Sequence, residues 1–153
     1  LIQANINNIQ INEAKEVIPM IDIQYTIETE QYGNKTGNRL FIPANIFRKG
    51  FTTPDLKQRV QDIHINYGYL DTDSICLQIP EGYTIESLPK TCQVTSSFGS
   101  FSSSLMIKDK EICIIHRLLM HRGIYPKEIY KDFLEFRKQI AAQYSSKIIL
   151  KKE

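Results

Sequence analysis

Residues 96–151 read SSFGSFSSSLMIKDKEICIIHRLLMHRGIYPKEIYKDFLEFRKQIAAQYSSKIILK, and this stretch decides the fold class. A turn is expected at Phe98-Gly99-Ser100, and a β-hairpin is expected to fold back at residues 108–110. An abrupt turn at residues 123–126, one amphipathic helix and a closing apolar strand follow. This order is typical of a β-rich scaffold that carries a single helix, and it shows no assembled active site.

The helix is expected between residues 126 and 144. Pro126 suits its start because the first helical N–H groups have no partner to lose. Apolar side chains then recur at spacings of three and four, which places them on one face. The members of this stripe are Ile129, Phe133, Phe136, Ile140 and Tyr144. Full burial of each is worth about 1.5–3 kcal/mol before entropy is subtracted, so the helix should pack on a sheet.

Alternation of polar and apolar residues predicts strands elsewhere. Residues 17–29 alternate most clearly, and one set of side chains is expected to face a core. That set is Ile21, Ile23, Tyr25 and Ile27. In the preceding segment the phase slips at Asn7-Asn8, which predicts a β-bulge or tight bend. Turns are expected at Gly33-Asn34 and Gly37-Asn38.

Shorter strands are expected further along the chain, at residues 39–42, 62–69, 75–79, 83–87, 92–97, 101–107, 111–120 and 147–150. In two of these strands, alternate side chains are expected to face the core. In the first strand they are Ile63, Ile65, Tyr67 and Tyr69, and in the second they are Ile75, Leu77 and Ile79. Between strands, Pro80-Glu81-Gly82 predicts a turn with Pro in its second position and Gly in its fourth.

We therefore predict a mainly β, mostly antiparallel, β-sandwich-like fold of about eight to ten strands with one C-terminal helix. A single domain is expected over residues 1–153. Its leading strands occupy residues 1–44, a connecting loop occupies 45–57, and the remainder with the helix occupies 58–153.

Composition excludes some function classes. The net charge is only +2, and Lys and Arg are scattered among Asp and Glu, so the concentrated basic face of a nucleic-acid-binding protein is missing. No apolar run approaches the ~20 residues that cross a bilayer, and no signal-peptide pattern is present. The first residue is Leu1, not Met, which suggests a piece of a longer precursor.

The three cysteines, Cys76, Cys92 and Cys113, form no C-x-x-C pair, which argues against a structural zinc site or a redox dithiol. We expect small core fillers or, in an exported protein, one disulfide and one free thiol. Cys113 and His116 are three residues apart in a strand and therefore point to opposite faces. This separation argues against a catalytic thiol–imidazole pair.

The remaining polar residues favour ordinary surface roles. His116 and His121 are five apart in a strand, so they cannot hold one ion together and are interpreted as strand-end polarity. His64 is expected at the surface. Asp71 and Asp73 lack the Gly and closing Glu of a calcium loop, which favours a solvated turn. The chain contains Tyr and Phe but no Trp, which favours packing of the aromatic side chains in the core over an exposed aromatic surface that binds sugar. We predict no catalytic, cofactor-binding or metal-binding residue.

An ordered set of segments resembles a known family. The set comprises Ile79–Pro89, Phe98-Gly99-Ser100-Phe101, Arg117, Gly123, Tyr125-Pro126, Tyr130, Phe133, Phe136 and Lys147–Lys152. From about residue 47 to 152 the chain is similar to the C-terminal domain of large bacterial proteins with a transglutaminase-like central domain. The resemblance implies an exported parent, periplasmic or surface-associated, with a β-sandwich-like tail. It implies no functional residues here, because the Cys-His-Asp chemistry belongs to the preceding domain.

Three functions stay open. The first is a non-catalytic accessory domain that supports, docks against or recruits substrate for upstream domains of the same polypeptide. The second is a standalone module that binds polysaccharide or peptide at a sheet face or edge, which predicts a contiguous exposed aromatic patch. The third is a cysteine hydrolase, which requires one unusually reactive thiol. No cofactor and no nucleic-acid partner is expected.

Overall fold

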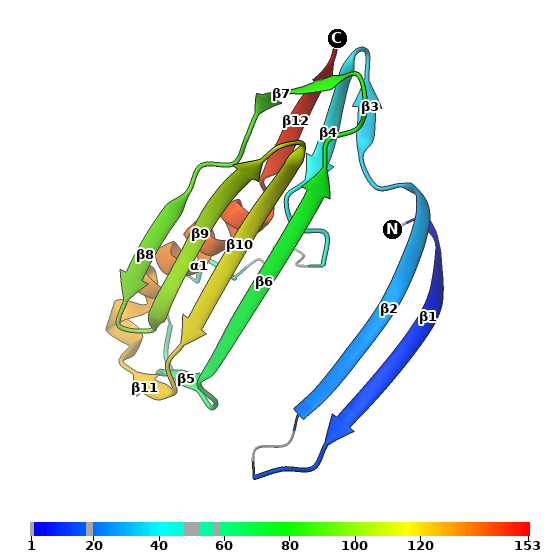
Figure 1. Cartoon of the computed structure of the whole chain (residues 1–153). Coiled ribbons are helices and arrows are strands. Elements are labelled where there is room, and N and C mark those ends of the chain that lie inside the picture. The colour runs from blue at the N-terminus through cyan, green and yellow to red at the C-terminus, as the bar shows by residue number, and fades with distance from the viewer. Residues whose placement is uncertain (1, 18–19, 48–52, 57–58) are drawn as a thin grey trace. The chain divides into compact units, whose positions relative to one another are not determined.

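The structure is a computed structural model that describes residues 2–17, 20–47, 53–56 and 59–153. These residues form twelve strands (Figure 1): β1 Ile2–Ala14, β2 Met20–Gln31, β3 Asn34–Thr36, β4 Arg39–Pro43, β5 Ile63–Ile65, β6 Tyr69–Gln78, β7 Tyr83–Ser87, β8 Cys92–Ser96, β9 Gly99–Lys108, β10 Glu111–Met120, β11 Gly123–Tyr125 and β12 Lys147–Lys152. One helical segment comprises a 3-10 turn at Lys127–Ile129 and helix α1 at Tyr130–Tyr144.

The predicted fold class is confirmed: the described pairings are antiparallel, and the helix lies near the C-terminus. Twelve strands exceed the predicted eight to ten because two strands of only three residues each, β3 and β11, lie where the sequence predicted turns. Described residues 45–47 and 53–56 contain no helix or strand, as expected for a connecting loop. The rest of the predicted loop lies outside the described residues.

Two compact units make up the chain, residues 1–34 and residues 35–153, here named the ribbon and the body. The predicted single domain over residues 1–153 stays a prediction. No helix in the described part of the chain is long and apolar enough to cross a membrane.

The ribbon is the antiparallel pair of β1 and β2. Ile11 lies directly opposite Ile23, and Ile6 lies directly opposite Ile27. The register shifts between Asn7 and Gln10, and the backbone of Asn8 has φ of 54°. Asn tolerates this left-handed conformation better than most residues. The predicted bulge at Asn7-Asn8 is therefore confirmed.

The apolar row of β2 does not face a core, and that prediction was wrong. Ile21 is 63% exposed, Ile23 54% and Tyr25 48%, while only Ile27 is half-buried. Alternation reports that the two faces of a strand differ in polarity, but it does not show that a second layer covers either face. The described residues of the ribbon form only the two strands β1 and β2, so the ribbon supplies no such layer itself.

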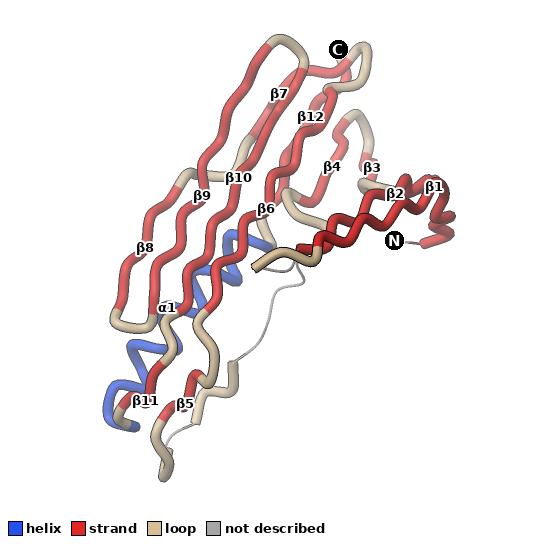
Figure 2. The backbone as a smooth tube through the Cα atoms, turned by 60° about the horizontal axis from the view of Figure 1, so that its bottom comes forward, coloured by secondary structure: helices blue, strands red, loops and turns tan. Residues whose placement is uncertain are grey.

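In the body, β6, β10, β9 and β8 form a sheet in that order, and α1 covers one face of it (Figure 2). We call this covered face the inner face. The core between helix and strands contains Ile63, Phe98, Phe101, Leu118, Met120, Tyr130, Leu134, Phe136, Ile140 and Tyr144. The layer packed on this sheet is therefore the helix.

The predicted helix is confirmed, but its buried stripe is wider than expected. Tyr130 and Leu134 are also buried, whereas Ile129 and Phe133 are half-buried. The Tyr130 hydroxyl donates a hydrogen bond to the carbonyl of Pro54, and the Arg59 guanidinium lies 4.7 Å from the Tyr130 ring. Pro54 and Arg59 thus cover a second side of the helix. The spacing of apolar residues within the helix does not predict this contact.

A second sheet has the order β3-β4-β12-β7. Ile148 pairs with Ile42 and Leu150 pairs with Leu40, which gives this sheet a buried apolar row. The short strand that ends at Pro43 and the closing strand after the helix were both predicted from the sequence and are confirmed.

One turn and one strand differ from expectation in detail. The Tyr83 N–H donates to the Pro80 carbonyl at 3.2 Å, so Pro80 is first in the turn and Gly82, with φ of 74°, is third. This is the glycine position of a type II turn, not the predicted fourth position. The inward row from Ile63 was also too long: Tyr67 is 82% exposed because the chain leaves the strand between β5 and β6.

Candidate functional site

One row of residues on the inner face has the composition of a catalytic triad. His116 in β10 lies opposite Asp73 in β6 on one side and Ser103 in β9 on the other. His116 is 1% exposed, Ser103 is buried and Asp73 is half-buried. Serine, histidine and aspartate in a row are the residue types of hydrolytic nucleophile activation. Their geometry decides whether they can act together.

The geometry of the row is that of a packed core. Among the described residues, neither ring nitrogen of His116 has a hydrogen-bond partner. Its ring packs edge-on against Tyr144 of α1 at 5.2 Å and lies 5.8 Å from Phe101. Asp73 accepts a hydrogen bond from the Asn45 amide at 3.1 Å. An activated nucleophile needs a hydrogen-bonded base beside an open space, and this row lies beneath a helix.

Burial lowers the pKa of His116, and the nearby Asp73 carboxylate opposes that shift in part. The interpretation of His116 as strand-end polarity was wrong, because it is among the most buried side chains of the body. It shares its position in the alternation of β10 with Ile112, Ile114 and Leu118, all of which are buried. A neutral imidazole in this position contributes to the core.

The other two histidines lie elsewhere in the body. His64 is exposed in β5, as predicted. His121 is exposed beyond the end of β10, where its Nδ1 lies 3.3 Å from the Ser97 carbonyl.

The predicted solvated turn at Asp71 and Asp73 was wrong, because β6 runs without interruption through both residues and both are half-buried.

The cysteines divide into one disulfide and one free thiol. Cys76 in β6 is bonded to Cys113 in β10 across the outer face of the sheet, and Cys92 is free and half-buried. The core-filler interpretation was wrong for the bonded pair and right for Cys92, which packs against the core. Burial raises the pKa of the Cys92 thiol, with partial compensation from a hydrogen bond to the Ser103 backbone. This direction disfavours the reactive thiolate.

As predicted, Cys113 and His116 point to opposite faces of β10. In the described part of the chain, one group of potential metal ligands lies on the outer face, where donor atoms of Cys76, Glu111 and Cys113 all lie within 4.8 Å of one another. Two of these donors are joined in the disulfide.

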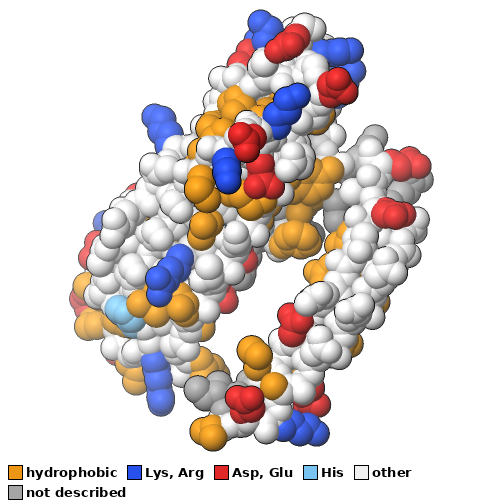
Figure 3. Space-filling model, viewed as in Figure 1, with side chains coloured by type: hydrophobic (Ala, Val, Ile, Leu, Met, Phe, Trp, Pro, Cys, Tyr) orange, Lys and Arg blue, Asp and Glu red, His pale blue; other side chains and the backbone are white. Residues whose placement is uncertain are grey.

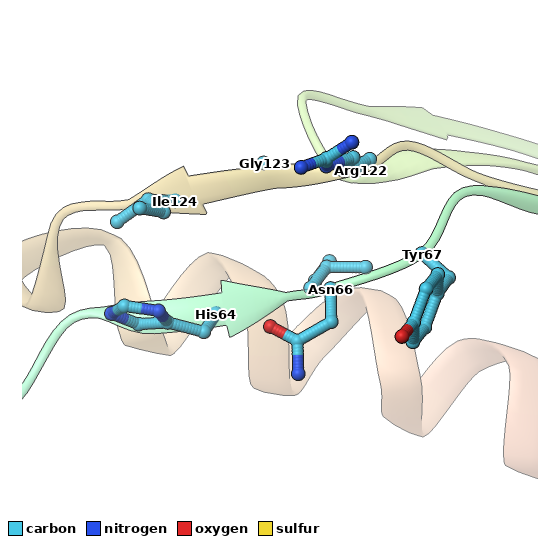
Figure 4. A pocket seen from close by; sticks show the side chains of 7 residues that line it. His64, Asn66, Tyr67, Arg122, Gly123 and Ile124 are labelled. Carbon is cyan, nitrogen blue, oxygen red and sulfur yellow. The ribbon is translucent and has the colours of Figure 1, made fainter.

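A surface hollow of about 370 Å³ lies where β5 pairs with β11 (Figure 4). Its polar and aromatic lining comes from His64, Asn66, Tyr67 and Arg122. In Figure 4 the Arg122 side chain leaves its strand on the side opposite to Asn66 and Tyr67. The polar groups therefore do not converge on one point, as they do in most small-molecule sites.

A family model matches residues 38–150, which lie within the body. Its description is a domain of unknown function with a solved structure, DUF3858. The chain belongs to this family. The ribbon lies outside the matched residues of the DUF3858 domain, and the match shows no association with transglutaminases. No curated protein and no solved structure gives a significant match to the chain.

Proposed function

We propose that this DUF3858 chain is a non-catalytic accessory domain of a larger exported protein and that its ribbon is the docking element. The observation that carries the proposal is the exposed apolar face of the ribbon. Ile6, Ile11 and Ile23 are each more than half exposed although they lie on the same face of one β-ladder. A contiguous apolar surface of this kind marks an interaction site.

The size of this face supports a protein partner. Twelve residues of β2 extend about 40 Å, and two strands that each occupy a width of about 4.8 Å give a face of roughly 400 Å². A two-stranded ribbon is only marginally stable in water without a covering layer. Docking would thus stabilise the ribbon and remove its apolar side chains from water.

Three acidic residues of the ribbon support the same orientation, whereas Glu13, opposite Ile21, lies at the end of the apolar face. Residues 1–34 contain five acidic residues and one basic residue. Asp22, Glu28 and Glu30 alternate with the apolar row of β2 and so lie on its other face. Figure 3 shows hydrophobic side chains on the ribbon surface with acidic ones beside them. A partner on the apolar face leaves these carboxylates in water.

A non-catalytic role agrees with the body. Its Asp-His-Ser row is packed beneath α1, two of three thiols form a disulfide, and the third has a raised pKa. The Cys76–Cys113 disulfide is compatible with export, since disulfides persist in oxidising compartments. The resemblance described above suggests an upstream transglutaminase-like domain as the surface that the ribbon contacts.

The proposal is tested in the full-length protein with Ile23→Asp, which places a charge on the apolar face. Gln24→Asp is the matched control because it adds the same charge to the other face of the same strand. We expect Ile23→Asp to increase protease cleavage between domains and to lower activity or substrate binding, and we expect Gln24→Asp to change neither. Equal effects of both variants, or no effect of either, contradict the proposal.

A second candidate, recognition of polysaccharide or peptide, is favoured by the hollow between β5 and β11. Its lining includes the Arg122 guanidinium and the exposed Tyr67 ring. Arg122→Ala with Tyr67→Ala should abolish retention of the chain on a glycan or peptide array. The absence of retained ligands for the unaltered chain removes this candidate.

A further inference from the structure

We propose that reduction of the Cys76–Cys113 disulfide opens a binding site for one thiophilic divalent cation, such as Zn²⁺, on the outer face of the sheet. The ligands are the two thiolates and the Glu111 carboxylate. The site is independent of the docking role of the ribbon, and it lies on the opposite side of the sheet from helix α1.

The strand register places the ligands together. Cys76 and Cys113 are directly opposite each other in the β6–β10 ladder, with Cα atoms 4.1 Å apart. Glu111 is two residues before Cys113 and therefore lies on the same face of β10. Its Oε2 atom lies 3.6 Å from the Cys113 sulfur. Three donors thus converge from two strands whose backbones are held by hydrogen bonds.

The spacing suits tetrahedral coordination. Zn–S bonds of about 2.3 Å require sulfur atoms about 3.8 Å apart, and Zn–O bonds are about 2.0–2.2 Å long. The three donor atoms already lie within 4.8 Å of one another. Rotation of the cysteine side chains can therefore form the site without a change in the ladder. The fourth position faces solvent, because Cys76 is exposed, and water can occupy it.

Gln78 orients the carboxylate. It lies opposite Glu111 in the ladder, and its Nε2 donates a hydrogen bond to Glu111 Oε1 at 3.2 Å. The other oxygen, Oε2, is the one beside the sulfur. Hydrogen bonds that fix a ligand in this way are typical of metal sites and contribute to their affinity.

A dithiol is one reductant that balances the redox step. It supplies two electrons and two protons: the S–S bond of Cys76–Cys113 breaks, two S–H bonds form, and the reductant becomes a disulfide. Cation binding then releases both thiol protons to solvent. In the oxidised chain neither sulfur is available as a thiolate, so the cation site exists only after reduction.

Cd²⁺ is a suitable probe because its bonds to thiolates absorb in the ultraviolet. The chain is reduced with a phosphine, freed of reductant without oxygen, and titrated with Cd²⁺. We expect one Cd²⁺ per reduced chain and none per oxidised chain. Cys92→Ser should bind as the unaltered chain does, Cys76→Ser should lose binding, and Glu111→Gln should bind at least about tenfold more weakly. Glu128→Gln is the control for loss of an exposed carboxylate.

A second measurement avoids variants that fail to fold. In the reduced unaltered chain, Cd²⁺ should protect Cys76 and Cys113 from alkylation, as read by mass spectrometry of peptides, and should not protect Cys92. The proposal is overturned if the reduced chain binds no Cd²⁺, if the oxidised chain binds equally well, if Cys76→Ser keeps its binding, or if protection falls on Cys92.

Discussion

Acid should destabilise the body because His116 lies uncharged between α1 and the sheet. The imidazole is 1% exposed and is enclosed by Phe101 and Tyr144, while Asp73 is the charged group that faces it from β6. Its pKa in the folded chain is lowered by burial, so the unfolded chain binds a proton at a higher pH than the folded chain does. Stability should therefore fall as the pH decreases below about 6.5.

The loss of stability caused by protonation of His116 has an upper limit. If the folded imidazole stays neutral, the free energy of unfolding decreases by at most about 2 kcal/mol between about pH 7.5 and about pH 5, with a slope that approaches about 1.4 kcal/mol per pH unit. The Asp73 carboxylate raises the pKa of His116 and so makes the loss smaller. Once the pH passes below the folded pKa, this contribution no longer changes.

Urea unfolding at a series of pH values measures this effect. His116→Phe should remove most of the decrease between about pH 7.5 and about pH 5. Ile114→Val, a core change on the same face of β10, should cost about 0.5–1.5 kcal/mol and leave the pH dependence intact. Identical pH dependence in the unaltered chain and in His116→Phe would refute the reasoning. If His116→Phe does not fold, the ring signals of His116 in a nuclear magnetic resonance titration of the unaltered chain should still titrate with a pKa below the usual value of about 6.5.

Three further outcomes follow from the body. Gly99→Ala should destabilise the chain because an added Cβ would lie 1.9 Å from the Leu119 carbonyl oxygen and because φ is 149°. Overpacking should cost about 1–3 kcal/mol, and backbone strain should cost about 1–3 kcal/mol more. Gly37→Ala, with open space around it, should cost only about 1–2 kcal/mol in chemical denaturation. Cys92 should react with iodoacetamide near neutral pH more slowly than it does in the urea-unfolded chain, and equal rates contradict its burial. Ile140→Ala should cost about 2–5 kcal/mol, since Ile140 is fully buried on the core-facing side of α1, and a loss below 1 kcal/mol by the same measurement argues against that packing.

Local elements of the fold could be predicted because their signals lie within a few residues. The β9–β10 hairpin is an example: its turn at Asp109, which has φ of 54°, also fixes the partners of each strand. Ser103 lies opposite His116 because Lys108 pairs with Glu111, so the turn is one residue shorter than the predicted 108–110. The helix after Pro126 is a second example, since one apolar stripe and one start signal define it.

Contacts between distant strands could not be predicted in the same way. Asp73 opposite His116 and Cys76 opposite Cys113 both depend on the pairing of β6 with β10, which no turn connects directly. Burial of His116 depends on that pairing and on the position of α1. The exposure of Ile23 shows the same limit, because alternation contains no information about which layer covers a face.

Hydrogen exchange of the ribbon tests the central claim most directly. Backbone amides of β1 and β2 are compared between the 153-residue chain alone and the full-length protein. Docking of the apolar face predicts fast exchange in the isolated chain and at least about tenfold slower exchange in the larger protein, a change of about 1.4 kcal/mol in opening free energy. Equal exchange in both would contradict the account.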